Sequence, residues 1–348
     1  EIYTLSLHDA LPISERVKKF GFTASEYEVA RTNILKSLEN SYNNRDKQRN
    51  SSYSQEYVRA FTDGEPIPGI EFEYQFMQAL VPNIPVEAIN MTLQQLISDE
   101  NIVIAVTGPE KEDLVYPSDE ELLSVINSVK AEEIEAYAEQ VIDEPLIATP
   151  PTPGKIVKEE QNEAMDATIW TLQNGIKVIL KNTDFKDDEI LMTATSTGGY
   201  SQYAVQDPVN SRIMGSVMNL GGVGNFSATD LPKVLAGKTA SVRPSISLTT
   251  QDFNGSSSIK DFETMMQLVY LYFTAPRKDA DAFKSFIQRM ETQLKNQEAE
   301  PMVAFSDSIN HAIYGNNPMT NRIKLSDLAK VDYDRIMEMY KQQFRNPG

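Results

Sequence analysis

Apolar residues recur every three or four positions through the first 140 residues, which is the spacing of amphipathic helices. Thr23–Glu26 has the pattern of a capping box, and the same pattern returns at Ser118–Glu121. Asp63–Gly64 carries a helix stop signal, and Pro85 carries a helix start signal. We therefore expect four helices, over residues 24–42, 53–61, 85–97 and 119–142.

One short apolar run, Ile102–Val106, is rich in β-branched residues and predicts a buried strand among these helices. Helices and strand together predict an αβ domain over residues 14–144. Prolines then crowd residues 145–154 and acidic residues follow, a composition that favours extended, solvated backbone. We expect a Pro/Thr/Glu-rich linker over residues 145–167.

Beyond the linker the pattern favours strands first and helices afterwards. The runs Thr168–Leu172 and Ile176–Leu180 are joined through Asn174–Gly175, the strongest short-range hairpin signal. A third strand is expected over 190–196. Helical spacing follows over residues 207–220, 262–275, 283–294, 303–313 and 332–344. This order predicts an α+β fold over residues 168–348, a two-layer αβ sandwich with a largely antiparallel sheet and helices packed on one face.

Composition limits the chemistry of the chain. With 348 residues, 41% hydrophobic and 24% charged, it has enough apolar surface for about two folded domains. A net charge of -18 without a Lys/Arg cluster argues against nucleic-acid binding and favours cationic peptides. Cysteine is absent, so disulfides and a thiol nucleophile are excluded. No apolar run is long enough for a membrane span.

The chain contains two histidines, His8 and His311, and neither has a histidine partner three or four residues away. A zinc-binding pair on a helix needs a second ligand residue on the same face, and a Ser-His-Asp triad depends on histidine, a residue type that is nearly missing here. The acidic pairs Asp187–Asp188 and Asp332/Asp334 lack the ligand number of a calcium loop. We therefore expect no catalytic residue and no metal ligand in this chain, and substrate-binding residues are not identified.

Three small-residue motifs fail as functional sites. Ala236–Thr239 resembles the end of a phosphate-binding loop, but Pro232 replaces the required glycine, which argues against a nucleotide-dependent enzyme. Gly221–Gly224 lacks dinucleotide-binding spacing and is expected to be a helix C-cap and tight turn. In Gly255–Ser258 the second glycine of a nucleophile elbow is missing, so we expect Ser258 to cap the following helix.

Both ends of the sequence look unusual. Residues 1–13 lack an initiator Met and the features of a signal peptide, and they resemble a translated adapter. We expect them to be a non-native leader, in which case His8 is not a native residue. The last residues stop on a turn signal directly after a helix, so the 168–348 domain is expected to be truncated at its C-terminus.

The order and spacing of several segments resemble the insulinase/pitrilysin family of zinc metallopeptidases (inverzincins). The resemblance covers residues 14–348, and the segments that carry it are 64–74, 107–111, 170–180, 222–226, 235–238, 255–258 and 271–277. Proteins of this family are built from repeated αβ domains in two halves that close around a peptide. The active half carries H-x-x-E-H on a helix, where histidines and a later glutamate hold zinc and the motif's glutamate activates water.

The helix that matches this motif, residues 207–220, contains neither His nor Glu. The resemblance therefore implies an internal fragment, with the end of the first half, a hinge linker and the non-catalytic third domain. It implies zinc in the parent protein and none in this chain, which alone is expected to be inactive. The implied partners are a peptide substrate, bound by the full-length parent, and the missing catalytic half.

A second hypothesis stays open at this point. The parent could instead be a non-proteolytic homologue that acts as an assembly or binding partner of a catalytic subunit, and an upstream H-x-x-E-H motif would distinguish the two. The compartment is also open, and the resemblance admits a bacterial periplasmic parent.

Overall fold

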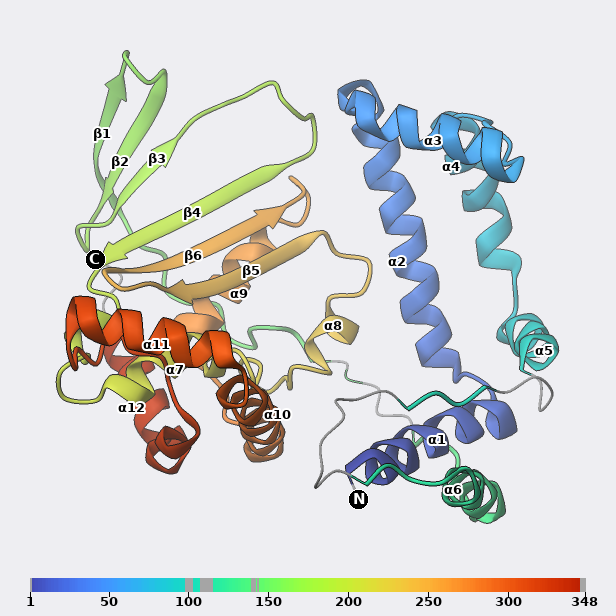
Figure 1. Cartoon of the computed structure of the whole chain (residues 1–348). Coiled ribbons are helices and arrows are strands. Elements are labelled where there is room, and N and C mark those ends of the chain that lie inside the picture. Colours follow the sequence, from blue (N-terminus) through green and yellow to red (C-terminus); the bar gives the residue numbers. More distant parts are fainter. Residues whose placement is uncertain (1, 98–102, 107–114, 139–141, 143, 345–348) are drawn as a thin grey trace. The chain divides into compact units, whose positions relative to one another are not determined.

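The computed structural model describes residues 2–97, 103–106, 115–138, 142 and 144–344, with the backbone alone for residues 2–10. The chain divides into two compact units (Figure 1). The first unit comprises residues 1–42 and 63–141, and the second comprises residues 43–62 and 142–348. Each unit has its own arrangement of elements.

The described part of the first unit is helical. Its elements are α1 (Ile2–Phe20), α2 (Ala24–Asn43), α4 (Ile70–Leu80), the 3-10 turn η2 (Val81–Asn83), α5 (Val86–Leu96) and α6 (Asp119–Ala131). Both expected capping boxes are present. The Thr23 amide donates to Glu26 Oε2 at 2.8 Å and the Glu26 amide to Thr23 Oγ1 at 3.2 Å, while Ser118 and Glu121 exchange the same bonds before α6. Helix α1 packs against α6 (Figure 1).

Three features of this unit differ from the sequence prediction. Residues 103–106 form no strand, and residue 102 lies outside the described part of the chain. Val103 is 87% exposed, and the described residues of this unit offer no second strand to pair with it. Helix α6 ends at Ala131 rather than near 142, where the like charges of Glu132 and Glu135 disfavour another turn. Helices α1 and α4 were not predicted.

The second unit contains two separate three-stranded sheets. The first has the order β1 (Ile156–Asn162), β2 (Ala167–Leu172), β3 (Lys177–Leu180), with both pairs antiparallel. The hairpin predicted at Asn174–Gly175 joins β2 to β3, and Gly175 supplies the left-handed φ of 88° that the turn requires. Strand β1 lies inside the 145–167 stretch expected to be a linker, because its backbone pairs with β2 while its charged side chains stay exposed.

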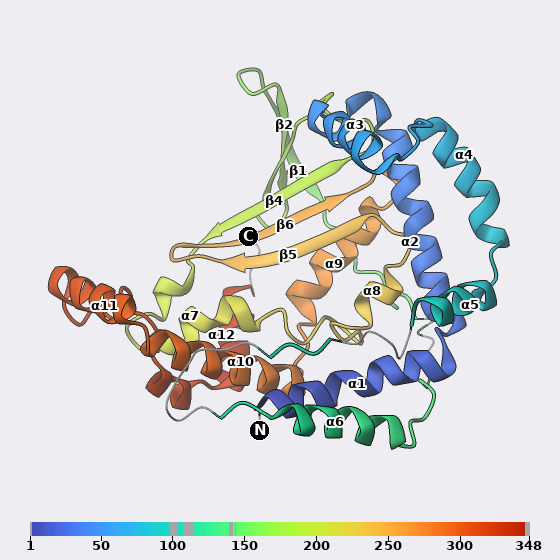
Figure 2. The ribbon, with the colours of Figure 1, turned by 45° about the vertical axis from the view of Figure 1, so that its right-hand side comes forward.

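The second sheet has the order β4 (Ile190–Thr197), β6 (Thr250–Ser257), β5 (Ala240–Ile246) (Figure 2). It is antiparallel throughout, and Phe253 in the central strand lies opposite Ala194 on one side and Pro244 on the other. Pro244 has no amide hydrogen to donate, which suits an edge strand. Of these three strands the sequence predicted only β4.

Helices make up most of the rest of the second unit. They are α3 (Asn50–Asp63), α7 (Pro208–Val217), α8 (Leu231–Val234), α9 (Phe262–Thr274), α10 (Ala280–Glu298), α11 (Pro301–Tyr314) and α12 (Tyr333–Gln343), with the 3-10 turns η1 (Arg45–Lys47), η3 (Tyr200–Gln202) and η4 (Leu325–Lys330). The expected α+β class, with antiparallel sheets and helices, is confirmed.

The core of the second unit lies between the β4–β6–β5 sheet and the helices α7 and α12. Phe253 reaches it from the central strand, with its ring centroid 4.6 Å from Phe273 and 5.1 Å from Phe344. Aromatic pairs at these separations add packing energy beyond the burial of area. The helix that resembles the family's metal helix, α7, is therefore part of the best-packed region of the unit.

Candidate functional site

Helix α7 is the element in which a family-type metal site would lie, and its boundaries are well defined. Asp207 caps it by accepting from the Asn210 amide at 3.3 Å, and Pro208 occupies the first turn, where a missing amide hydrogen costs nothing. The helix ends at Val217, and its ten residues include no His, Glu, Asp or Cys. The helix start that the sequence predicted at Asp207–Pro208 is present.

The inward face of α7 is closed by packing. Met214 and Val217 are completely buried, and Ile213 is nearly so. Ser211 is also buried, and its hydroxyl donates to the Pro208 carbonyl at 3.3 Å, so it is engaged with its own helix. Zinc sites need imidazole, thiolate or carboxylate ligands and a polar second shell, which this face does not offer. The residues present do not fit a zinc ion.

A polar network joins the start of α7 to the start of α12. Buried Asn210 donates from Nδ2 to Asp207 Oδ1 at 2.9 Å and to the Lys330 carbonyl at 3.2 Å, and its Oδ1 accepts from the Asp332 amide at 2.8 Å. Arg335 Nε lies 3.3 Å from Asp207 Oδ2. The contact between Asn210 and Asp207 stays within the start of α7. The other three contacts join α7 and its cap to Lys330, Asp332 and Arg335, which gives this network a structural role.

Two tyrosines near the same core are held in their neutral form. Tyr340 Oη donates to the Tyr272 carbonyl at 2.6 Å. Burial disfavours the phenolate and raises the pKa of both Tyr340 and Tyr272 above the ordinary value of 10.0. Neither hydroxyl can therefore act as a base near neutral pH.

The two histidines are not brought into a metal site. His311 is exposed on α11, and no group of three or more His, Cys, Asp or Glu residues in the described part of the chain is placed to hold a metal ion. His8 lies in the first part of α1, residues 2–10, for which only the backbone is described.

The acidic pairs singled out in the sequence have other partners. Asp188 accepts from the Ile259 amide at 2.9 Å and from Asn43 Nδ2 at 3.2 Å. Asp332 caps α12 by accepting from the Arg335 amide at 3.1 Å, and Asp334 forms an ion pair with Lys278. These contacts account for three of the four carboxylates, and Asp187 is exposed.

The glycine and serine motifs are turns, with two corrections. Gly221 and Gly222 form the expected tight turn, since a Cβ at Gly221 would lie 2.1 Å from the Arg277 carbonyl oxygen and Gly222 has a φ of 82°. The C-cap of α7 is Met218, so the prediction of a C-cap at Gly221 is wrong. Ser258 does not cap α9 either.

Ser258 instead belongs to a small buried cluster one turn before the helix. Its hydroxyl donates to Asp261 Oδ2 at 2.8 Å, and the same oxygen accepts from the Thr239 amide at 2.8 Å. Asp261 itself is the residue before α9. The carboxylate thus ties the start of β5 to the start of α9, and the Ala236–Thr239 motif contributes an amide to it.

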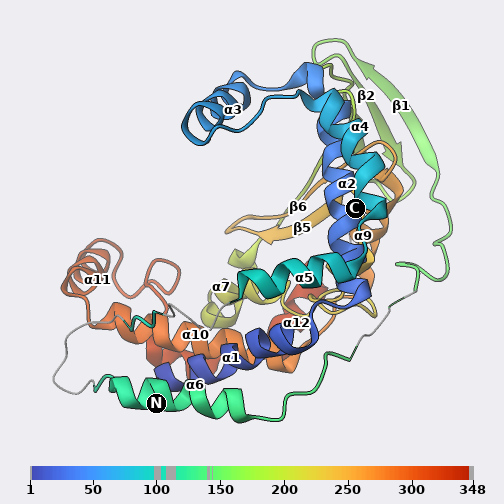
Figure 3. The ribbon, with the colours of Figure 1, turned by 90° about the vertical axis from the view of Figure 1, so that its right-hand side faces the viewer.

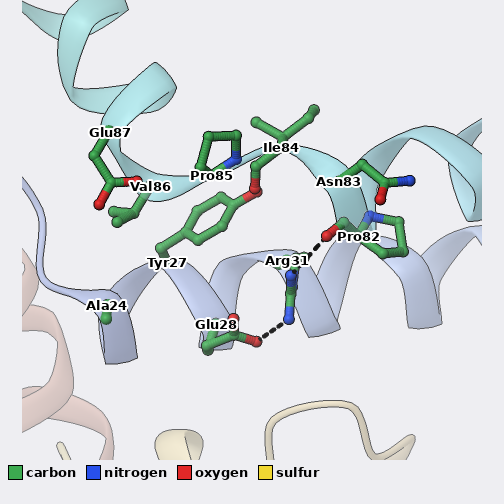
Figure 4. A pocket seen from close by; sticks show the side chains of 10 residues that line it. All are labelled: Ala24, Tyr27, Glu28, Arg31, Pro82, Asn83, Ile84, Pro85, Val86 and Glu87. Carbon is green, nitrogen blue, oxygen red and sulfur yellow. Dashed lines mark hydrogen bonds and ion pairs between the residues drawn. The ribbon is translucent and has the colours of Figure 1, made fainter.

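The first unit contains a small hollow that the sequence did not predict (Figure 4). It has a volume of about 250 Å³ and lies between α2 and the segment from Pro82 to Glu87. Tyr27 Oη donates to the Ile84 carbonyl at 2.7 Å, and Arg31 binds Glu28 Oε2 at 2.5 Å and the Pro82 carbonyl at 3.4 Å. The hollow is smaller than typical ligand pockets, and its polar groups already bind one another.

Comparison with known proteins relates the whole chain to zinc proteases. No family model matches it. A protein of Arabidopsis thaliana described as a zinc protease PQQL-like is 29% identical over 335 residues, which is 96% of this chain and 32% of that protein. The chain therefore spans about a third of the length of this relative.

Solved structures agree on the fold. The periplasmic protease PqqL from Escherichia coli matches 99% of this chain with 38% of its own length, at a TM-score of 0.54 and 17% identity. The ferredoxin protease FusC, solved in complex with Arabidopsis ferredoxin, matches 97% of this chain with 38% of its own length, at a TM-score of 0.57 and 14% identity. At these identities the likeness concerns the fold.

Among the residues that the structure describes, no helix combines the length and apolar character needed to cross a bilayer.

Proposed function

We propose that the chain is a member of the insulinase/pitrilysin-type zinc metallopeptidases and that it forms a non-catalytic central part of such an enzyme, supported by its similarity to a PQQL-like zinc protease and by the shared fold of PqqL. Its role is to supply chamber wall and hinge for peptide hydrolysis that an N-terminal H-x-x-E-H domain carries out. The zinc ion, its ligands and the activated water belong to that other part of the parent protein. This chain contributes shape and surface.

The observation that carries this proposal is the composition and burial of helix α7. A catalytic metal helix must expose ligands and leave one coordination position open to substrate and water. Helix α7 has no ligand side chains, and Ser211 and Met214 on its inner face are buried in the core. A helix used this way stabilises its unit and leaves no room for a reacting peptide.

The domain organisation follows from the same proposal. Residues 14–144 form the end of the preceding αβ domain, residues 145–167 are the hinge region, and residues 168–348 are the third, non-catalytic domain. Strand β1 adds a structured segment to the second half of the hinge region. The exposed stretch from residue 150 to 155 has three prolines and suits an extended, semi-rigid spacer, in which Gly154 is the position most free to bend.

We extend the substrate class and compartment from the relatives to the parent protein. A peptide or small protein is the substrate, and the net charge of -18 attracts basic segments to the chamber wall. PqqL is described as periplasmic, which supports a bacterial periplasmic parent. Peptide binding that decreases steeply with added salt would support the electrostatic part, and a flat salt dependence would contradict it.

A direct test is metal content and peptidase activity of the purified chain. After incubation with zinc and desalting, we expect far less than one equivalent of zinc per chain by elemental mass spectrometry, and no cleavage of a quenched fluorescent peptide library. Stoichiometric zinc together with chelator-sensitive hydrolysis would contradict the proposal. In that case His311→Ala and His8→Ala would show whether either imidazole holds the ion.

A second test concerns the parent gene. The proposal requires an H-x-x-E-H motif in the sequence upstream of the matched third of the protein. A full-length reading frame without that motif would instead favour the non-proteolytic binding-partner hypothesis.

A further inference from the structure

Helix α11 carries an exposed apolar stripe, formed by Met302, Phe305, Ile309 and Ile313. These residues are spaced three or four positions apart and therefore lie along one side of the helix. They are 67%, 58%, 43% and 64% exposed, and α11 has no buried residue. Helix α11 extends beyond the end of α10 (Figure 3).

Polar contacts hold α11 in this orientation. Val303, Asp307 and Asn310, on a different side of the helix, are the half-buried positions. Arg322 Nε donates to both carboxylate oxygens of Asp307, at 3.0 and 2.9 Å, and the two side chains are only 23% and 24% exposed. A charge-assisted contact of this kind fixes the rotation of the helix, so the apolar stripe stays directed to solvent.

The apolar stripe is also unusually free of charge for so acidic a chain. On α11 the residues beside it are Ser306 and Ala312, which are small and neutral, and Asp307 is the helix's one carboxylate and is paired with Arg322. Like-charge repulsion between two acidic molecules is therefore lowest at this surface. Small flanking residues also allow close approach of a second helix.

We propose that the apolar stripe of α11 is the docking surface for a second copy of this chain, in an antiparallel helix pair. The stripe is self-complementary about a two-fold axis near its middle, where Phe305 meets Ile309 of the second copy and Met302 meets Ile313. Such a pairing goes beyond the proposed peptidase role and does not depend on it. The antiparallel direction also places the two helix dipoles favourably.

The exposed area is sufficient for a weak dimer. Four large side chains at these exposures offer roughly 500 Å² per copy and about 1,000 Å² for the pair. That total is near the lower limit for specific interfaces, so dissociation in the micromolar range is expected. A patch of this size lies within the range of the largest apolar patches on monomer surfaces, which are often functional.

The test is sedimentation velocity of the full chain over a range of concentrations. We expect a monomer–dimer equilibrium, and Phe305→Asp or Ile309→Asp should raise the dimer dissociation constant by at least about 30-fold. Val205→Asp is the matched control, because Val205 is 88% exposed in the same unit but lies off the apolar stripe. Circular dichroism would confirm that each variant remains folded.

Cross-linking tests the orientation, since the chain has no cysteine of its own. In an antiparallel pair, a mixture of Met302→Cys and Ile313→Cys chains should form a disulfide-linked dimer, while neither variant should do so alone. Equivalent positions would be about 16 Å apart, too far for a disulfide. A monomer at all concentrations, or a dimer that both Asp variants leave intact, would overturn the proposal.

Discussion

At the scale of single residues, a few glycines decide whether strands and helices can meet. Gly199, two residues after the end of β4, has a φ of 64°, and a Cβ built there would lie 2.5 Å from the Leu248 carbonyl oxygen. Its amide donates to buried Gln251 at 2.8 Å, and its carbonyl accepts from Gln343 of α12. One residue thus links strand β4, the β5–β6 turn and α12.

Gly199→Ala should therefore destabilise the second unit by more than backbone strain alone. With a φ of 64° and a ψ of -173°, Gly199 adopts a conformation almost restricted to glycine, where strain costs about 1–3 kcal/mol, and the clash with a backbone carbonyl forces a further shift of the turn. Gly175→Ala is the matched control, because Gly175 has a φ of 88° but no atom within 4 Å of the built Cβ. Urea unfolding should give a loss of about 2–4 kcal/mol for Gly199→Ala and about 1 kcal/mol for Gly175→Ala. Equal losses would show that the close contact is unimportant.

At the scale of elements, the sequence predicted those segments that carry a local signal. The Asn174–Gly175 hairpin, the capped helices α2, α6, α7 and the long helices α10 to α12 all have strong spacing or turn chemistry. Strands β5 and β6 have neither, because Pro244 interrupts one and Asn254–Gly255 the other. They are strands because they pair with each other and because β6 also pairs with β4, which only the three-dimensional structure reveals.

For the candidate site, the sequence predicted which ligand residues α7 lacks, but it did not predict how the helix packs against its neighbours. The absence of His and Glu is visible in the sequence. The burial of Ser211 and Met214, and the bridge from Asn210 to α12, depend on residues more than a hundred positions apart. The strand expected at Ile102–Val106 shows the opposite error, since an apolar run forms a strand only where a partner strand exists.

Asn210 makes buried polar contacts to the start of α12, whereas Arg335 makes a more exposed one to Asp207. Removing each should therefore change the free energy of unfolding by a different amount. Asn210→Ala should lower the free energy of unfolding by about 1–3 kcal/mol, because it leaves the Asp332 amide and the Lys330 carbonyl without this partner in a buried place. Arg335→Gln removes the more exposed contact to Asp207 and should cost at most about 1 kcal/mol. Chemical denaturation of both variants would measure this, and a larger loss for Arg335→Gln would contradict the assignment.

At the scale of the whole molecule, the chain consists of two units with separate sets of buried residues. In the first unit the buried residues include Leu122 and Val129 of α6, whereas in the second they centre on α7 and α12. A region with few buried apolar side chains opens at low free energy. The first unit, with many exposed large apolar residues along α4 and α5, is therefore expected to be the less stable of the two.

Two matched core variants test whether the units unfold as separate cooperative blocks. Leu122→Ala and Met214→Ala each remove a large buried side chain, at a cost of about 2–5 kcal/mol. We expect Leu122→Ala to speed amide hydrogen exchange in the first unit alone, and Met214→Ala to do so in the second alone. Exchange followed by mass spectrometry resolves this peptide by peptide. If either substitution accelerated exchange equally across residues 1–42, 63–141 and 168–344, the chain would be one cooperative unit, and a hinge near residue 150 would lose its physical basis.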